Sequence, residues 1–272
     1  MLRVALLLLV FPFVSVVNAA LPLFDAHLHY NEEDAHEFTP QAIIRILQRN
    51  KVTHALVTSR PPQRVQALHE QAPDRIIPFL GVYEQLADKQ TWHQDTTLPA
   101  RVARQLESGT WYGIGELHIF AEHRHSPVLR QLVQLAMQHR LPLLMHADPA
   151  IIDTIYDIEP GVRVIWAHAG AYPYPDLLAD YLGRYPNLSI DLSVRNERIA
   201  PGSELGEQWY ELFIRYPDRF LVGVDTFSPN RWREYAAITR TIRGWLAQLP
   251  QDVAKQLAYH NARSLLLSSE TE

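Results

Sequence analysis

Apolar residues in this chain occur in short runs that alternate with longer segments in which they follow helical spacing. Several runs, such as residues 75–80 and 220–224, are almost unbroken. Unbroken apolar runs are typical of strands that are buried on both faces, as in a parallel sheet. We therefore predict eight strands, at residues 23–28, 54–59, 76–82, 112–117, 141–146, 162–167, 188–192 and 220–224.

Helix signals lie between these runs. Thr39-Pro40, Ser126-Pro127 and Ser228-Pro229 each pair a capping residue with a proline suited to the first helical position. Apolar residues at positions 129, 132, 133 and 136 form one face of a helix. A further helix is expected at the carboxyl end, over residues 250–267.

Strands that alternate with helices over about 250 residues predict a single (β/α)8 barrel, the TIM-barrel fold. No linker or change of composition divides residues 20–272, so we expect one domain. An open, doubly wound sheet is the alternative fold, because it uses the same alternation.

Residues 1–19 read as a signal peptide. Arg3 precedes an apolar stretch at 4–17, and Ala19 supplies a small residue before the expected cleavage point. A membrane anchor is the alternative, but the stretch contains Pro12 and is shorter than the roughly 20 apolar residues of a typical span. We expect a secreted or periplasmic protein with no membrane anchor after cleavage.

Composition narrows the chemistry. The 272 residues are 47% hydrophobic and 20% charged, as in ordinary globular proteins. The sequence has no cysteine, which excludes disulfides, thiolate metal sites and a cysteine nucleophile. The net charge of −5 and the lack of a basic run disfavour a nucleic-acid partner.

Candidate metal ligands stand where the predicted strands end. His27 and His29 are two residues apart, so a strand would project both imidazoles from the same face. In a barrel the carboxyl ends of all strands meet at one rim, where active sites lie. Imidazole and carboxylate together suit zinc, with manganese, iron or nickel as substitutes. The other candidates on this rim are Glu116, His146, His168 and Asp225.

Each candidate also has a structural explanation when taken alone. His168 would be a buried histidine bonded to the backbone, and Glu116 would begin a solvated loop. Asp225 would cap the next helix, although Ser228 already stands at that place. The coincidence of six such residues on one rim favours a shared metal site.

The order His-x-His, Glu, His, His, Asp resembles the amidohydrolase superfamily. The segments at 24–29, 167–170, 223–225 and 261–266 are similar to its amidohydrolase-related branch of lactonases and decarboxylases. Gly115-Glu116 resembles the TatD-like deoxyribonuclease branch. The lysine that often bridges two metals in the superfamily is absent from strand four, which leaves one or two ions possible.

The resemblance implies specific roles. His27, His29 and Asp225 would hold one ion. Glu116 would bridge to a second ion bound by His146 and His168. Asp225 would be the general base for a metal-activated water, and with one ion His168 would act from outside the metal's ligand shell.

Substrate contacts are expected from the loops after the strands. An arginine there would grip a carboxylate or phosphate, or would form a surface ion pair. The candidates are Arg60, Tyr83, His118 and Arg195. Trp166 is expected to face away from the site and to pack against helices.

The leading hypothesis is a metal-dependent hydrolase of a small ester, lactone or amide, with an anionic substrate suiting the arginines. A decarboxylase with the same metal-held base is the second hypothesis. A TatD-like nuclease is the third, and a non-catalytic metal- or ligand-binding barrel belongs to a different class.

Overall fold

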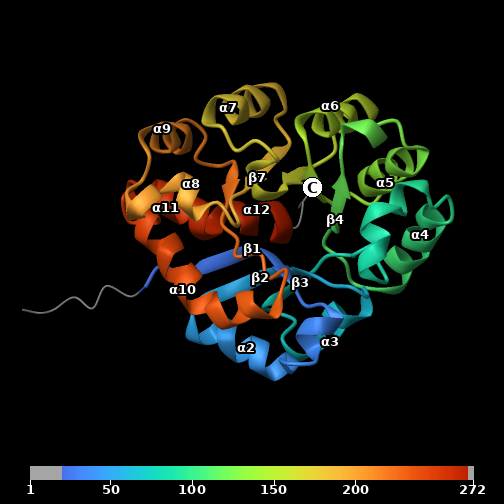
Figure 1. Ribbon diagram of the computed structural model, residues 1–272, viewed down its shortest axis with the longest axis horizontal. Coiled ribbons are helices and arrows are strands. Elements are labelled where there is room, and N and C mark those ends of the chain that lie inside the picture. Colours follow the sequence, from blue (N-terminus) through green and yellow to red (C-terminus); the bar gives the residue numbers. More distant parts are fainter. Residues whose placement is uncertain (1–19, 269–272) are drawn as a thin grey trace, which may run out of the picture.

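The computed structural model describes residues 20–268. The expected signal peptide at 1–19 and the last four residues of the predicted domain lie outside the described residues. Figure 1 shows the helices arranged around a central set of strands. Within residues 20–268, no helix has both the length and the apolar character that crossing a membrane requires.

All eight predicted strands are present, with shifted ends. They are β1 (Leu23–His29), β2 (Val52–Thr58), β3 (Ile76–Pro78), β4 (Ile114–Ile119), β5 (Leu143–Ala147), β6 (Val164–Trp166), β7 (Leu188–Asp191) and β8 (Phe220–Leu221). β3 and the last four strands are shorter than predicted. After β6 and β8 the chain leaves the hydrogen-bonded ladder early, before His168 and Asp225.

Helices follow most strands. The α-helices are α1 (Glu32–Ala35), α2 (Pro40–Arg49), α3 (Gln63–Gln71), α4 (Leu98–Ser108), α5 (Pro127–Gln138), α6 (Pro149–Ile158), α7 (Pro175–Arg184), α8 (Asn196–Ile199), α9 (Glu207–Arg215), α10 (Pro229–Leu246), α11 (Gln251–Lys255) and α12 (Asn261–Leu267). The short helical turns are η1 (Leu86–Gln90), η2 (Trp92–Gln94), η3 (Ala121–His123), η4 (Ala167–Ala169), η5 (Pro201–Ser203) and η6 (Gln256–His260).

The predicted helix caps are partly confirmed. Thr39 accepts a hydrogen bond from the backbone of α2, and Ser126 accepts two from that of α5. Ser228 stands at the N-cap of α10 without a side-chain capping bond. The predicted terminal helix is helical from Gln251 to Leu267, with a π-helical turn between α11 and α12.

The strands pair in parallel as two sheets, in the orders β1-β2-β3 and β4-β5-β6-β7-β8. Leu80 pairs with Ile114 at one seam between the sheets. At the other seam, the Ala26 amide donates to the Val222 carbonyl at 2.9 Å. Backbone bonds at both seams fit the predicted (β/α)8 barrel and not an open sheet.

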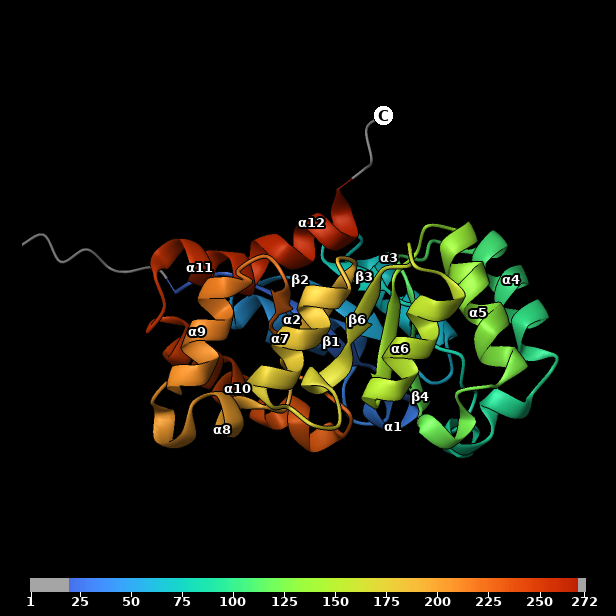
Figure 2. The same ribbon diagram turned by 90° about the horizontal axis from the view of Figure 1, so that it is seen from above.

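Two apolar layers hold the barrel. Phe24, Ala26, Leu56, Leu144 and Ile165 pack in an inner cluster with residues of α12, which closes the amino-terminal end of the barrel. Figure 2 shows α12 on one side of the strands and α1 and α8 on the other. The helices that follow β1 and β7 therefore mark the end of the barrel where the strands finish.

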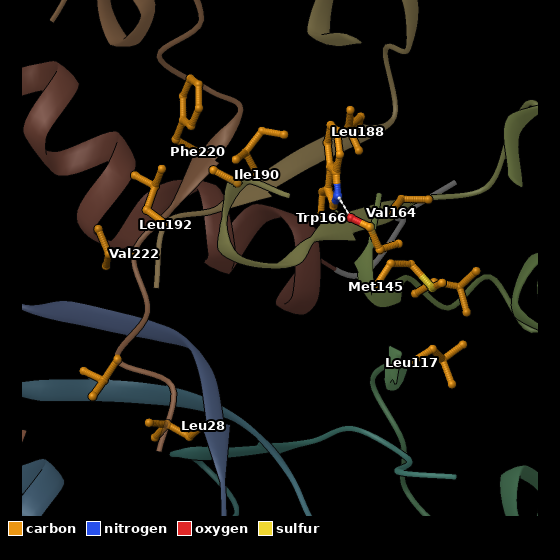
Figure 3. Close-up of a cluster of buried hydrophobic side chains, with 14 of the residues drawn as sticks. Leu28, Leu117, Met145, Val164, Trp166, Leu188, Ile190, Leu192, Phe220 and Val222 are labelled. Carbon is orange, nitrogen blue, oxygen red and sulfur yellow. Dashed lines mark hydrogen bonds between the residues drawn. The ribbon is translucent and has the colours of Figure 1, made fainter. Parts of the chain in front are cut away.

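The outer cluster lies between strands and helices, and Figure 3 shows part of it. Trp166 is fully buried there, stacks obliquely on Tyr181 of α7 and donates its indole hydrogen to the Ala147 carbonyl at 2.8 Å. The predicted helix-facing position of Trp166 is confirmed. The predicted apolar face of α5 is also buried.

Candidate metal centre

Two ligand-bearing strands are irregular at the site. The register of β1 against β2 shifts between Asp25 and Leu28, and that of β4 against β5 shifts between Gly115 and Leu117. Such irregularities re-aim side chains next to active sites. Here they turn His27 and Glu116 toward the centre of the rim.

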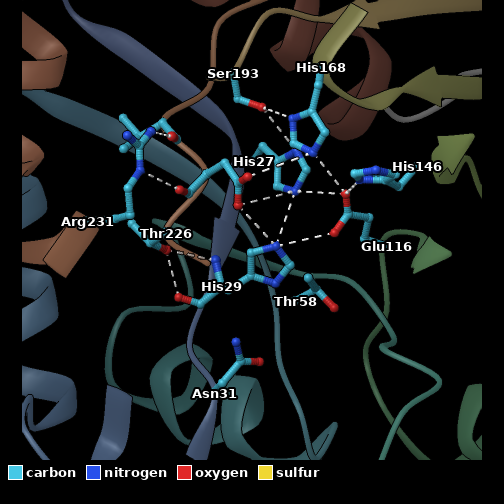
Figure 4. A network of polar contacts seen from close by, with 12 residues as sticks. His27, His29, Asn31, Thr58, Glu116, His146, His168, Ser193, Thr226 and Arg231 are labelled. Atoms are coloured by element: carbon cyan, nitrogen blue, oxygen red, sulfur yellow. Dashed lines mark hydrogen bonds and ion pairs between the residues drawn. The ribbon is translucent and has the colours of Figure 1, made fainter. Parts of the chain in front are cut away.

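The six predicted ligands converge. Figure 4 shows His27, His29, Glu116, His146 and His168 pointing toward one another from four different strands or their ends. Glu116 Oε1 lies 3.1 Å from His146 Nδ1 and 3.1 Å from His168 Nε2. Asp225 joins them, because its Oδ1 lies 3.2 Å from His29 Nε2.

Asp191 at the end of β7 fixes the orientation of His27. Its Oδ2 is 2.8 Å from His27 Nδ1, and neither residue is exposed to solvent. A carboxylate only accepts hydrogen bonds, so Nδ1 carries a hydrogen. The other nitrogen, Nε2, is then directed at the cluster and left to bind a proton or a metal ion.

Ser193 links Asp191 to His168 and fixes the orientation of the His168 ring. Its hydroxyl donates to Asp191 Oδ2 at 2.5 Å, so its oxygen accepts from His168 Nδ1 at 2.8 Å. His168 Nε2 therefore also faces the cluster. One carboxylate sets the ring orientation of two predicted ligands, one directly and one through a hydroxyl.

The atoms that face each other need a cation between them. His27 Nε2 is only 3.3 Å from His29 Nε2. Asp225 Oδ1 is buried and has no hydrogen-bond partner among residues 20–268. Converging acceptors in a buried site repel one another unless protons or a metal ion lie between them. The donor set of imidazoles and carboxylates fits a divalent metal.

Ligand atoms gather in overlapping groups. His27, His29 and Asp225 form one group, in agreement with the first predicted ion. Glu116, His118 and His146 form a second group that shares no residue with the first. His168 lies with His27 and Glu116 in a third, so its predicted assignment to the second ion stays a prediction.

The charges in this cluster depend on one another. Burial opposes ionisation of Asp225, but the facing His27 and His29 lower its pKa to about 2. Burial would lower the pKa of His27, yet Asp225 and Asp191 raise it well above its ordinary value. The pocket therefore attracts positive charge, which a metal ion supplies in place of protons.

Two of the predicted ligands sit on strained backbone. His168 and Asp225 have φ of 60° and 58°, a left-handed conformation that residues other than glycine seldom adopt. An arginine holds each carbonyl: Arg195 Nε donates to His168 O at 2.7 Å, and Arg231 Nε donates to Asp225 O at 3.0 Å. Strain kept in place by such bonds is typical of functional sites.

Gly223 permits the close approach of the chain after β8. A Cβ at this position would lie 2.6 Å from Asp191 Oδ1 and 2.9 Å from His27 Cβ. Only glycine therefore lets the segment that carries Asp225 pass beside the oriented histidine.

The sequence of residues 24–160, half of the chain, matches the model of the family described as TatD related DNase. The chain is a member of the TatD-related DNase family. No curated protein matches it by sequence.

Solved structures share the fold of this TatD-family chain. YjjV, a TatD homologue from Escherichia coli K12, has a TM-score of 0.62 and 14% identity, over 91% of this chain and 98% of that protein. The 4-oxalomesaconate hydratase LigJ from Rhodopseudomonas palustris has a TM-score of 0.59 and 11% identity, over 90% and 95%. An amidohydrolase from Burkholderia multivorans has a TM-score of 0.56 and 14% identity, over 90% and 98%.

The family match confirms the predicted TatD-like relation, and the solved structures confirm the predicted fold. The TatD-family chain is a metal-dependent hydrolase of the amidohydrolase superfamily with a TIM-barrel architecture. The identities to the solved structures are low, so those structures inform the fold and leave the substrate to be argued from the site.

A cavity of about 630 Å³ opens onto the metal centre of the TatD-family chain. That volume is typical of sites for small molecules. The predicted substrate residues Arg60, His118 and Arg195 line it together with five of the six predicted ligands. Tyr83 lies behind this wall: it is buried, and its hydroxyl accepts a hydrogen bond from the His118 amide at 2.8 Å.

Both predicted substrate arginines already have partners. Arg60 donates two hydrogen bonds to Glu33, at 2.8 and 3.0 Å, which matches the ion-pair alternative. Arg195 donates to the carbonyls of His168 and Gly170. Their roles in substrate binding stay predictions, since each still lines the cavity.

Sequence reasoning missed three residues of the site. Asp191 is the last residue of β7 and Ser193 follows it by two positions, the same spacing that singled out His27 and His29, so this signal was available. Lys89 lies in η1, in a segment with no periodic pattern, and nothing in the sequence distinguishes it.

Proposed function

We propose that this chain is an exported hydrolase that uses a metal-activated water to cleave a small ester, lactone or amide, with zinc as the metal. The observation that carries the proposal is the convergence of buried acceptor atoms on the floor of a cavity sized for a small molecule. A divalent ion there supplies Lewis acidity, which lowers the pKa of a water ligand toward about 7 and polarises the substrate's oxygen.

The protein's own groups would divide the work. His27, His29 and Asp225 would hold one ion, and Glu116 would bridge to a second held by His146 and His168. Asp191 would keep the rings of His27 and His168 turned inward. Asp225 suits the role of general base, because its Oδ1 receives no hydrogen bond and its low pKa keeps it ionised.

A panel of substrates tests the proposal. The protein without its first 19 residues would be loaded with zinc and assayed on a lactone, an aryl ester and an anilide. We expect turnover of at least one compound that is lost in the Asp225→Asn variant. Absence of turnover in a protein shown to hold zinc would count for the non-catalytic binding barrel.

Two other reactions have specific tests. The family match favours a phosphodiesterase, and an end-labelled oligonucleotide would reveal one. Carbon dioxide release from small carboxylic acids would reveal a decarboxylase. Export has its own test: the mass of protein from the secreted or periplasmic fraction would show a chain that begins at Ala20.

A further inference from the structure

Lys89 is the one lysine or arginine of the cavity wall that bonds neither to a carboxylate nor to a backbone carbonyl within residues 20–268. Its ammonium lies 3.1 Å from His118 Nε2 and takes part in no ion pair there. Arg60 is paired with Glu33, and Arg195 is bonded to backbone carbonyls. The two arginines that were predicted to bind an anion are thus bonded to other protein groups. Lys89, which was not predicted, is available to bind one.

The Lys89 ammonium is partly buried. Burial opposes the charge of Lys89 more strongly than the nearby carboxylates of Glu116 and Asp225 favour it, so its pKa is lowered. A metal ion in the neighbouring ligand groups would add positive charge to the same cavity. An anion bound beside Lys89 would add to the negative charge of Glu116 and Asp225 and so offset both effects.

Apolar side chains surround the mouth of the same cavity. Leu86 is 60% exposed, Phe227 is 58% exposed and Val194 is 37% exposed, and all three line the cavity. They come from three separate segments, after β3, β8 and β7. Exposed apolar groups that gather at a concave site mark a surface for an apolar ligand.

Val194 supports this interpretation independently. Its φ is 55°, a conformation that is strained for a β-branched residue. The chain thus holds an apolar side chain at the mouth in spite of both strain and exposure. Such an arrangement is characteristic of a site where the geometry serves binding.

We propose that the substrate joins a carboxylate, which Lys89 binds, to an aryl or alkyl group that packs on Leu86, Val194 and Phe227. This inference rests on the proposed hydrolase and narrows its substrate to an amphiphilic carboxylic acid derivative. The carboxylate and the apolar group are recognised in addition to the bond that is cleaved at the metal centre.

Three probes separate the two contacts. Isothermal titration of the zinc-loaded protein would compare 4-phenylbutyrate, 4-phenylbutanol and butyrate, which carry both groups, the apolar group only and the carboxylate only. We expect 4-phenylbutyrate to bind at least about tenfold more tightly than either of the others, in line with a charged contact and a buried ring.

Matched variants assign the contacts to residues. Lys89→Met keeps a side chain of similar length but removes the charge. It should lower the affinity for 4-phenylbutyrate about tenfold and leave the affinity for 4-phenylbutanol unchanged. Lys89→Arg should restore most of the affinity. Phe227→Ala should lower the affinity for both phenyl compounds and leave the affinity for butyrate unchanged. Lys255→Met, at an exposed position in α11, is the control for loss of a lysine.

Specific outcomes would overturn the inference. Equal affinity of wild type and Lys89→Met for 4-phenylbutyrate would mean that the carboxylate binds the metal and not Lys89. Equal affinity of wild type and Phe227→Ala for 4-phenylbutyrate would refute the proposed contact between the apolar group and Phe227. Turnover on the substrate panel is measured separately from binding. Binding that depends on Lys89 without turnover would refute the proposed hydrolase alone, and turnover without such binding would refute this inference alone.

Discussion

Replacement of Asp191 by asparagine tests the orientation of the predicted ligands. The Asp191 carboxylate accepts hydrogen bonds from His27 Nδ1 and Ser193 Oγ through Oδ2, and from the Ser193 amide through Oδ1 at 2.9 Å. An asparagine places a donor at one of these two oxygens. Either the new NH2 group faces the His27 N–H, or it faces the Ser193 N–H, so at least one donor loses its acceptor.

The expected loss of zinc affinity is estimated from the hydrogen bond between His27 and the charged Asp191 carboxylate. Such a hydrogen bond contributes about 1.5–3 kcal/mol. At about 1.4 kcal/mol for each factor of ten, this corresponds to a loss of about 10- to 100-fold in zinc affinity. Removal of the partner behind a metal-binding histidine has effects of the same size in other proteins.

Zinc affinity would be measured by competition with a chromophoric chelator, starting from metal-free protein. Asp25→Asn is the matched control, because Asp25 is also a buried carboxylate near His27 but bonds to its backbone amide and not to its ring. Burial raises the pKa of Asp25 to about 7, so a neutral amide resembles a form that it already populates. We expect a much smaller change in this control.

A folded Asp191→Asn protein that binds zinc as tightly as wild type would refute the reasoning. Folding is checked by the thermal unfolding midpoint of both metal-free proteins. Nitrogen NMR of the imidazoles adds a second readout, since His27 should exchange one protonated nitrogen for the other if Asp191 fixes its ring.

Two further predictions concern the same centre. Asp225→Asn should lower turnover at least about 100-fold while the protein stays folded, because a general base is lost; turnover per bound metal at the wild-type level would contradict that role. Zinc affinity should fall as the pH is lowered through the raised pKa of His27, and binding should release protons. Asp225, Asp191 and Glu116 raise that pKa against the effect of burial, and zinc must displace the proton. Titration calorimetry in buffers of different ionisation enthalpy measures the release, and a pH-independent affinity would argue against metal at His27.

The apolar pattern predicted the barrel well because parallel strands buried on both faces leave a strong local signal. It overestimated the lengths of β3 and of the last four strands, β6 and β8 among them. After β6 and β8 the chain turns early into His168 and toward Asp225, whose left-handed conformations are held by arginines outside those strands, Arg195 and Arg231. Such tertiary bonds override what local hydrophobicity indicates.

The ligand set was predictable because strand ends in a barrel share one rim. The partners of the charged loop residues were not predictable. That Arg60 is paired with Glu33, while Lys89 lacks a carboxylate partner within residues 20–268, depends on how separate loops fold over the rim. Sequence spacing contains no information on such pairing.

Metal content tests the central claim most directly. Elemental analysis of the purified protein, expressed without added chelator, should find about two equivalents of a divalent metal, as in two-metal hydrolases. Two groups of ligand atoms that share no residue, His27-His29-Asp225 and Glu116-His118-His146, support this expectation. A folded protein that contains no metal and takes up no added zinc would contradict it.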